Sequence, residues 1–204
     1  QYAYGANAAP VLLKSTKEPN KERAMTSQSP NHQIRALDSV TTLDASYCGQ
    51  VLVAGSHGAV YAAYLAAKGG VRGVILNDAG LGKDDAGISG LAYLDQFDIA
   101  GATIGHQSAR IGDGADMMAR GIIRNLNDTA RASGSAVGQS CADCAAAMLN
   151  APGATGTPPT MTESRFMLEP GDPEVWGLDS ASLILSEDEV RILICGSHGQ
   201  ALAG

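Results

Sequence analysis

The sequence predicts an α/β fold, a single domain with a mostly parallel sheet covered by helices. Apolar runs of strand length alternate with stretches that have apolar residues at helical spacing, which is typical of parallel sheets with crossover helices. Apolar residues make up 45% of the 204 residues and charged residues 17%, as expected for a globular domain with its own core. Glycine accounts for 25 residues and aromatic residues for 4%, so we expect tight turns and closely packed elements.

A stretch of 28 residues occurs twice in the chain. Residues 36–63 and 177–204 align without a gap at an offset of 141, and nine of the 28 positions are identical. Both copies contain Leu-Asp-Ser near the start and Gly-Ser-His-Gly after an apolar run, at 55–58 and 196–199. We therefore expect a C-terminal β-hairpin that repeats the N-terminal hairpin and brings both loops to one end of the fold. Alternatively, the second copy completes a neighbouring subunit, or the duplication matters only for packing.

The remaining elements follow in chain order. Residues 1–35 are polar, contain three prolines and show no sustained periodicity, so we expect a flexible N-terminal arm, with residues 36–204 forming the α/β domain. Residues 151–176 contain five prolines and are predicted to form a long connection to the second copy. The sequence predicts strands over 37–43, 50–54, 71–77 and 99–104, and helices over 59–68, 89–97, 115–132 and 141–150.

Charge and apolar patterning argue against two classes of partner. The net charge is −7, and no cluster of Lys or Arg supplies the basic face that nucleic acid would require. No apolar stretch approaches the roughly 20 residues needed to span a bilayer. The four cysteines are spread along the chain and no basic, apolar leader is visible, which indicates free thiols and a cytoplasmic location. Cys141 and Cys144 form a lone C-x-x-C and are expected to be buried small residues.

Polar residues gather in three loops that follow predicted strands, at 55–58, 77–87 and 105–114. Ligands of open α/β sheets bind beyond the carboxyl ends of the strands, and parallel strands would open all three loops on one edge. In the first loop, Gly55 and Gly58 allow a tight turn, and the N–H groups of the helix that follows favour a bound anion.

Within that first loop, His57 is the candidate general base, because an imidazole titrates near neutral pH. Ser56 is a candidate nucleophile or hydrogen-bond donor. The structural alternative for Ser56 is that it caps the helix that follows, since serine is a common N-cap.

In the second loop, Asp78 or Asp84 is expected to orient the histidine, as the carboxylate of a catalytic triad does. Lys83 is expected to neutralise a substrate anion or to act as an acid, and Asn77 is expected to bind the substrate. The alternative is a charged loop that is simply solvated.

In the third loop, His106, Ser108 and Arg110 are expected to bind substrate, with the guanidinium of Arg110 clamping a carboxylate or phosphate. Asp113 has the alternative of capping the next helix. His198 of the second copy is a further candidate binding residue, which would give a double site.

Three histidines together suit catalytic zinc, but the helical H-x-x-x-H spacing is absent, and we expect neither a metal nor a cofactor. The hypothesis is a small-molecule enzyme that acts on an anionic or amide-bearing metabolite by hydrolysis or proton transfer, with a histidine base. The expected partners are this anionic small molecule and further copies of the chain in a homo-oligomer. The alternative function is a non-catalytic ligand-binding or oligomeric assembly protein.

Overall fold

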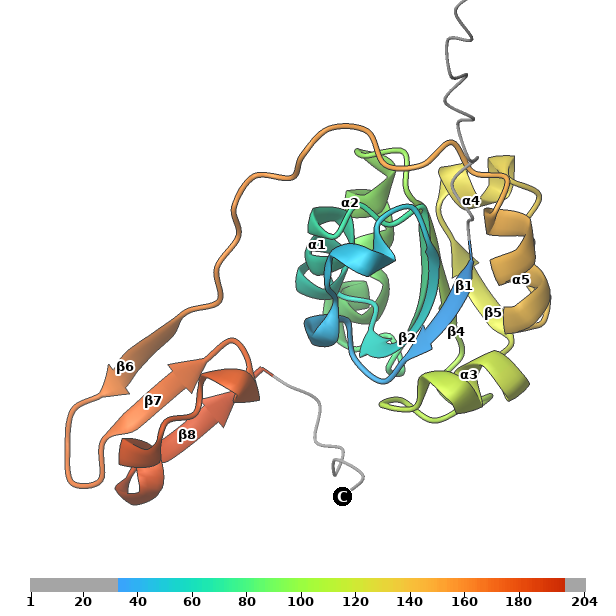
Figure 1. The fold of residues 1–204 in the computed structure, drawn as a ribbon. Helices are drawn as coiled ribbons and strands as arrows, with labels where there is room; N and C mark the ends of the chain where they lie inside the picture. The colour runs from blue at the N-terminus through green and yellow to red at the C-terminus, as the bar shows by residue number, and fades with distance from the viewer. Residues whose placement is uncertain (1–32, 197–204) are drawn as a thin grey trace, which may run out of the picture.

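The computed structural model describes residues 33–196, which form two separate sheets (Figure 1). The larger sheet has five strands in the order β1-β2-β3-β4-β5. Its first four strands are parallel and β5 runs antiparallel to β4. The predicted α/β class with a mostly parallel sheet is thus confirmed. The bounds are β1 Ile34–Leu37, β2 Val51–His57, β3 Gly73–Asn77, β4 Ala100–Ile104 and β5 Ile123–Leu126.

Helices cover both faces of this sheet, as expected for parallel strands with crossovers (Figure 1). On one face lie α1 (Val60–Lys68) and α2 (Gly90–Asp95), which bury alanines and leucines against the sheet. On the other face lie α3 (Gly114–Arg120), α4 (Asp128–Ala132) and α5 (Cys141–Met148). The strands carry apolar residues on both faces because both faces are covered.

Three expected elements differ from the structure, and one of them is the connection predicted over 151–176, which contains the strand β6 (Arg165–Glu169) and the start of β7 (Val175–Leu178). The strand predicted over 37–43 ends at Leu37, and a 3₁₀ turn, η1 (Val40–Thr42), follows it because the hydroxyl of Ser39 accepts the N–H of Thr41. The helix predicted over 115–132 is α3, β5 and α4 in sequence. Gly121 ends α3, and the side-chain oxygen of Asn127 caps α4 by accepting the N–H of Ala130.

The two cysteines of the C-x-x-C lie on α5 and are fully buried, as predicted. Burial raises the pKa of the Cys141 thiol to about 12, so this thiol stays protonated near neutral pH. Both cysteines pack in the core between α5 and the sheet.

The smaller, C-terminal sheet contains β6 (Arg165–Glu169), β7 (Val175–Leu178) and β8 (Ile192–Cys195). Strands β6 and β7 form an antiparallel hairpin, whereas β7 and β8 are parallel. A C-terminal hairpin therefore exists, but only the end of its second strand, Gly177 and Leu178, belongs to the second copy of the sequence. The prediction that each copy is itself a hairpin is wrong, because β1–β2 and β7–β8 are both parallel pairs.

The two similar stretches place the same elements at the same offset. Strand β7 lies 141 residues after β1, and η4 (Ala181–Leu183) lies 141 residues after η1. The hydroxyl of Ser180 accepts the N–H of Ser182, as Ser39 accepts that of Thr41. The strand pairs also share one register, since Ile34 faces Val51 and Val175 faces Ile192. Local sequence similarity thus corresponds to local similarity of backbone structure.

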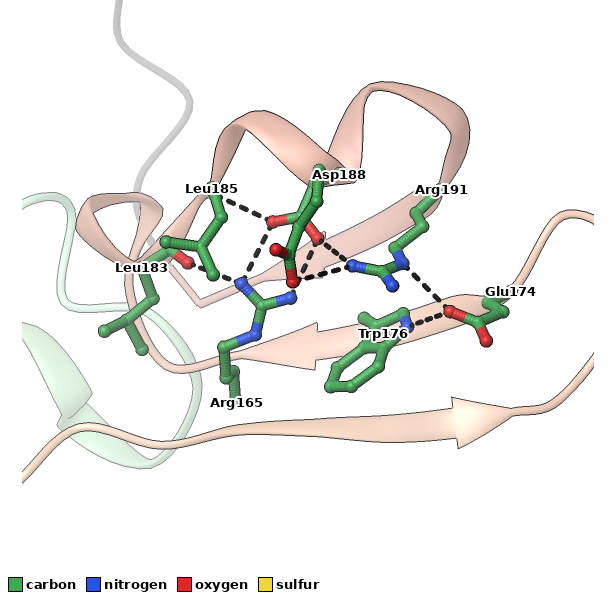
Figure 2. Close-up of polar contacts among 8 residues, drawn as sticks. Arg165, Glu174, Trp176, Leu183, Leu185, Asp188 and Arg191 are labelled. Atoms are coloured by element: carbon green, nitrogen blue, oxygen red, sulfur yellow. Dashed lines mark hydrogen bonds and ion pairs between the residues drawn. The ribbon is translucent and has the colours of Figure 1, made fainter.

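One face of the C-terminal sheet is closed by the turn η5 (Ser186–Val190) and a polar network (Figure 2). The buried carboxylate of Asp188 accepts hydrogen bonds from the N–H of Leu185 and the guanidinium groups of Arg165 and Arg191. Both guanidinium groups also lie over the ring of Trp176, at 4.8 and 5.1 Å from its centroid. The network therefore joins η5 to β6 and β7 and to Arg191, which directly precedes β8.

We expect acid to loosen this C-terminal sheet between about pH 4 and pH 2. The N–H of Leu185 and the guanidinium of Arg165 lower the pKa of Asp188 from 3.8 to about 2. A carboxyl group whose pKa is depressed in the fold stabilises it above the unfolded pKa, and this stabilisation is lost as pH falls. Trp176 is the single tryptophan of the chain, so its fluorescence reports on this sheet.

The Asp188→Asn variant should flatten this acid dependence of Trp176 fluorescence. Asp116→Asn is the matched control, because Asp116 also has a pKa of about 2. Asp116 pairs with Arg120 on α3, which covers the five-stranded sheet and not the C-terminal one. An acid transition of Trp176 that survives in Asp188→Asn would show that other groups hold the C-terminal sheet together.

The opposite face of the C-terminal sheet is apolar and uncovered within residues 33–196. In-register pairing places Phe166, Gly177 and Ile194 side by side on this face. Half-exposed apolar side chains form it, namely Phe166, Leu168, Ile192 and Ile194. Their counterparts in the first stretch behave differently, since Val51 and Val53 are fully buried in the core that α3 and α5 cover.

Candidate functional site

The carboxyl ends of β2, β3 and β4 lie on the same edge of the larger sheet, because these strands are parallel. A cavity of about 210 Å³ lies at this edge, where β3 and β4 end and β5 begins. It is lined by Asp78, Gly105, His106, Gln107, Ser108, Ile122 and Arg124. The second and third predicted loops thus share a cavity, and the antiparallel strand β5 supplies its remaining wall.

Asp78 and His106 form a hydrogen-bonded pair in this cavity. Asp78 follows β3 directly and is 4% exposed, and its Oδ1 lies 2.9 Å from Nδ1 of His106. The same oxygen accepts the N–H groups of Gly80 and His106, each at 2.9 Å. A carboxylate can only accept, so Nδ1 of the neutral imidazole carries the proton and Nε2 keeps its lone pair. The side chain of His106 is 47% exposed, which leaves this pair accessible.

The backbone around the pair is fixed by local turns. The N–H of Asp78 donates to the carbonyl of Ile104, which ties the end of β3 to β4. Gly80 has φ of +79°, a conformation that glycine adopts without strain, and a Cβ on this residue would lie 3.7 Å from Cε1 of the His106 imidazole. The turn after β3 therefore positions the carboxylate of Asp78 and leaves space beside the imidazole of His106.

Ser108 lines the cavity but its hydroxyl has structural partners. It donates to the carbonyl of Gly105 at 2.7 Å and accepts the N–H of Ile122 at 3.0 Å. These bonds close the turn from Gly105 to Ser108 and attach it to the segment that enters β5. The hydroxyl thereby positions the loop that carries His106.

Arg124 is the residue of the cavity that the sequence did not single out. It lies on β5, within the stretch predicted to be helical, and its exposed side chain reaches the same cavity as His106. Its stem lies where a side chain at Gly105 would otherwise be, since a Cβ there would be 2.8 Å from Cγ of Arg124. The adjacent β-branched residues Ile122 and Ile123, directly after Gly121, were the available signal for a strand.

The first predicted loop, 55–58, does not line this cavity. Ser56 is part of β2, and its hydroxyl accepts the N–H of Val40 at 3.0 Å. The expectation that Ser56 caps α1 is wrong, because the N-cap is Ala59 and it makes no side-chain cap bond. His57 is half-buried and faces Asn77 in the β2–β3 register.

Gly55 and Gly58 are sites of close backbone packing. A Cβ on Gly55 would lie 2.6 Å from the carbonyl oxygen of Asp38, and one on Gly58 would lie 2.3 Å from that of Gly87. Neighbouring backbone therefore occupies the space beside each of these two glycines. Their structural role explains why the turn requires glycine without any ligand.

The second loop divides into a buried start and an exposed tip. Asn77 is fully buried, and its side chain accepts the N–H of Ala79 at 2.9 Å and donates to the carbonyl of Ala109 at 3.4 Å. Lys83 and Asp84 are exposed on η3 (Lys83–Ile88) and do not line the cavity of His106. Of the two carboxylates expected to orient a histidine, Asp78 lies against an imidazole, and that imidazole is His106.

Arg110 points away from the cavity. Its side chain is 70% exposed, and its guanidinium lies 3.8 Å from the carboxylate of Asp113. Asp113 caps α3 by accepting the N–H of Asp116 at 2.8 Å, so the structural alternative for Asp113 is confirmed.

His198 of the second Gly-Ser-His-Gly lies outside the described residues. Within residues 33–196, no group of three or more His, Cys, Asp or Glu side chains has an arrangement that could hold a metal ion. The same part of the chain has no helix whose length and apolar character would let it cross a membrane.

The chain matches no protein-family model, and searches of the curated proteins and of the solved structures found no similar protein. Function is therefore inferred from the geometry of the cavity.

Proposed function

We propose that this protein is an enzyme that acts on a small molecule with His106 as its general base. The observation that carries the proposal is the 2.9 Å contact between the buried carboxylate of Asp78 and Nδ1 of the accessible His106. This arrangement is the carboxylate–imidazole half of a catalytic triad. His106 thus takes the role first considered for His57, and Asp78 keeps the orienting role expected of it.

The pair supports proton transfer in two steps. Nε2 accepts a proton from a water that attacks a carbonyl, or from a carbon next to a carbonyl, while the reacting bond forms. The imidazolium then interacts with Asp78 through Nδ1–H and returns the proton to the leaving group or to another carbon of the product. These steps correspond to hydrolysis and isomerisation, and the metabolite proposed is anionic or amide-bearing.

Turnover of a panel of simple probes tests this proposal. The panel contains p-nitrophenyl acetate, p-nitrophenyl phosphate and small p-nitroanilides, which represent esters, phosphate esters and amides. We expect the wild-type chain to accelerate at least one probe and His106→Asn to lose at least about 100-fold of that rate, the lower range for a general base. Asparagine places an amide N–H near the position of Nδ1, so it can keep the bond to Asp78 while removing the base.

Two results would contradict the proposal. One is that His106→Asn turns over every probe as fast as the wild-type chain. The other is that the rate falls in His57→Asn instead, which would return the base to the first loop.

A second candidate function is assembly of copies of this chain through the C-terminal sheet. The uncovered face with Phe166, Leu168, Ile192 and Ile194 supports it, because exposed apolar faces of this kind mark interaction surfaces. The uncovered face also fits the idea that the two similar stretches are copies of one unit. Helices cover the first copy, and a second chain would cover the corresponding face of the other copy. If no probe is turned over, and Ile194→Asp converts a dimer to a monomer in solution, assembly replaces catalysis as the proposed function.

A further inference from the structure

We infer that Arg124 is the anion-binding residue of this site and that the substrate carries a carboxylate or phosphate group. The inference rests on the proposed function of His106 and narrows its substrate class. Its starting point is that Arg124 and His106 line the same cavity from different strands, β5 and the end of β4.

Arg124 is available to a ligand because its charge has no counter-ion within the described residues. Most other cationic side chains there have partners of their own. Arg120, Arg165 and Arg191 are paired with carboxylates, while Arg35 and Lys68 lie over tyrosine rings. Within residues 33–196, Arg124 takes part in no ion pair, no side-chain hydrogen bond and no contact with an aromatic ring. The exposed Lys83 also has none of these three kinds of contact in this part of the chain.

Position distinguishes Arg124 from Lys83 and from Arg110, the two cations first expected to hold an anion. Neither Lys83 nor Arg110 lines the cavity of His106, and Arg110 already lies near Asp113. Arg124 is therefore the one guanidinium or ammonium group among the described residues that lines it. Oδ1 of Asp78 already accepts three hydrogen bonds, and among the described residues no ion pair joins Asp78 to Arg124.

Gly105 is what lets Arg124 reach this position. A Cβ on Gly105 would lie 2.8 Å from Cγ and 3.5 Å from Cδ of Arg124, so any larger residue would displace the arginine stem. Gly105 also lies directly before His106 in the chain. The absence of a side chain at this one position brings the guanidinium and the imidazole to the same cavity.

The chemistry that this geometry favours is recognition of an oxyanion. A guanidinium presents two N–H groups in a planar fork that matches both oxygens of a carboxylate or two oxygens of a phosphate. The cavity of about 210 Å³ suits a small molecule, and Ile122 gives it one apolar wall. Arg124 also lines a neighbouring cavity of about 330 Å³, which leaves room for the part of the substrate that does not react.

Binding of inorganic phosphate and of acetate to the intact chain tests the inference. The measurement is the change in the ¹⁵N-labelled imidazole signals of His106 on titration, with the two anions in separate arms to distinguish phosphate from carboxylate substrates. We expect one or both anions to shift these signals saturably, and Arg124→Gln to weaken that binding at least about tenfold. Lys68→Gln is the charge-matched control, since it removes one exposed cation from the far end of α1 and should bind as the wild-type chain does.

A positioning variant separates geometry from charge. Gly105→Ala keeps the guanidinium but displaces it, so it should weaken anion binding severalfold while the Nδ1 signal of His106 still reports the bond to Asp78. Equal anion binding by Arg124→Gln and the wild-type chain would overturn the inference, as would the absence of any anion-induced shift in the wild-type chain. If either result occurs while p-nitrophenyl acetate is still hydrolysed in a His106-dependent manner, only the inference about Arg124 fails. Hydrolysis that does not depend on His106 is instead the failure of the proposed function.

Discussion

Asparagine in place of Asp78 is expected to lower the His106-dependent rate by about 10²- to 10⁴-fold, the upper value being the effect of replacing the carboxylate of a triad by an amide. An amide at this position can still accept the N–H groups of Gly80 and His106, so the turn should survive. Its NH₂ group takes the position of Oδ2, so the amide oxygen can still accept Nδ1–H, but the neutral side chain no longer stabilises the imidazolium that forms when His106 takes a proton. The measurement is kcat/KM for the probe that the wild-type chain turns over fastest.

The matched control for this variant is Asp85→Asn in the same connection between β3 and α2. Asp85 is exposed and has φ of 56°, a conformation that asparagine tolerates well. It should keep the wild-type rate, because its carboxylate does not line the cavity. Equal rates for Asp78→Asn and the wild-type chain would show that the carboxylate has no part in the reaction.

Alanine in place of Gly58 is expected to destabilise the five-stranded sheet by about 3 kcal/mol, the upper range for overpacking a tight contact. The added methyl would lie 2.3 Å from the carbonyl oxygen of Gly87 and 2.7 Å from Cγ2 of Thr103. Neither β2 nor the loop with Gly87 can move freely, since each is hydrogen-bonded to its neighbours. The midpoint of thermal unfolding should fall by roughly 10 °C.

Gly69→Ala provides the control for Gly58→Ala. Gly69 follows α1 with φ of −72°, and an added Cβ would make only ordinary contacts at 3.4 Å or more. Its unfolding midpoint should stay within a few degrees of the wild-type value, because alanine adopts this conformation without strain. If the two variants unfold at the same temperature, the contact between Gly58 and Gly87 is not the tight junction described here.

The positions of the parallel strands β2, β3 and β4 followed from local patterns in the sequence. Each apolar run bounded by glycine or asparagine became a strand, as at Gly73–Asn77, because such runs can be buried on both faces. The antiparallel strand β5 was not predicted, because Ile122 and Leu126 continue the i, i+4 helical spacing of Met118. Gly121 allows the chain to leave α3 at this point and enter β5, since a Cβ there would lie 2.5 Å from the carbonyl oxygen of Met117.

The common edge of the candidate site was also predictable, because parallel strands end on the same side. The choice of partner for Asp78 was not. That choice depends on the turn at Gly80 and on the bond from Asp78 N–H to Ile104, which are set by packing between strands that are distant in sequence. The place of Arg124 in the cavity was likewise not predictable from the sequence, because it depends on the pairing of β5 with β4.

His57 was predicted to be the base partly because it lies in the Gly-Ser-His-Gly motif, which occurs twice in the sequence. In the first copy, its glycines are explained by backbone packing and Ser56 by its bond to Val40. A similar close approach recurs at Gly196, where a Cβ would lie 2.9 Å from the carbonyl oxygen of Asp179. The repeated motif therefore corresponds to a structural turn at these positions. The imidazole that is hydrogen-bonded to Asp78 is that of His106, in a loop that occurs only once in the sequence.

The tautomer of His106 tests the account most directly, and the ¹⁵N chemical shifts of its imidazole nitrogens measure it. At a pH where the ring is neutral, the bond to Asp78 predicts a protonated Nδ1 and an unprotonated Nε2. Substitution of Asp78 by alanine, which removes the acceptor of Nδ1–H, should shift the proton toward Nε2. A ring protonated mainly at Nε2 in the wild-type chain, or one unaffected by the substitution, would contradict the assignment of His106 as the base.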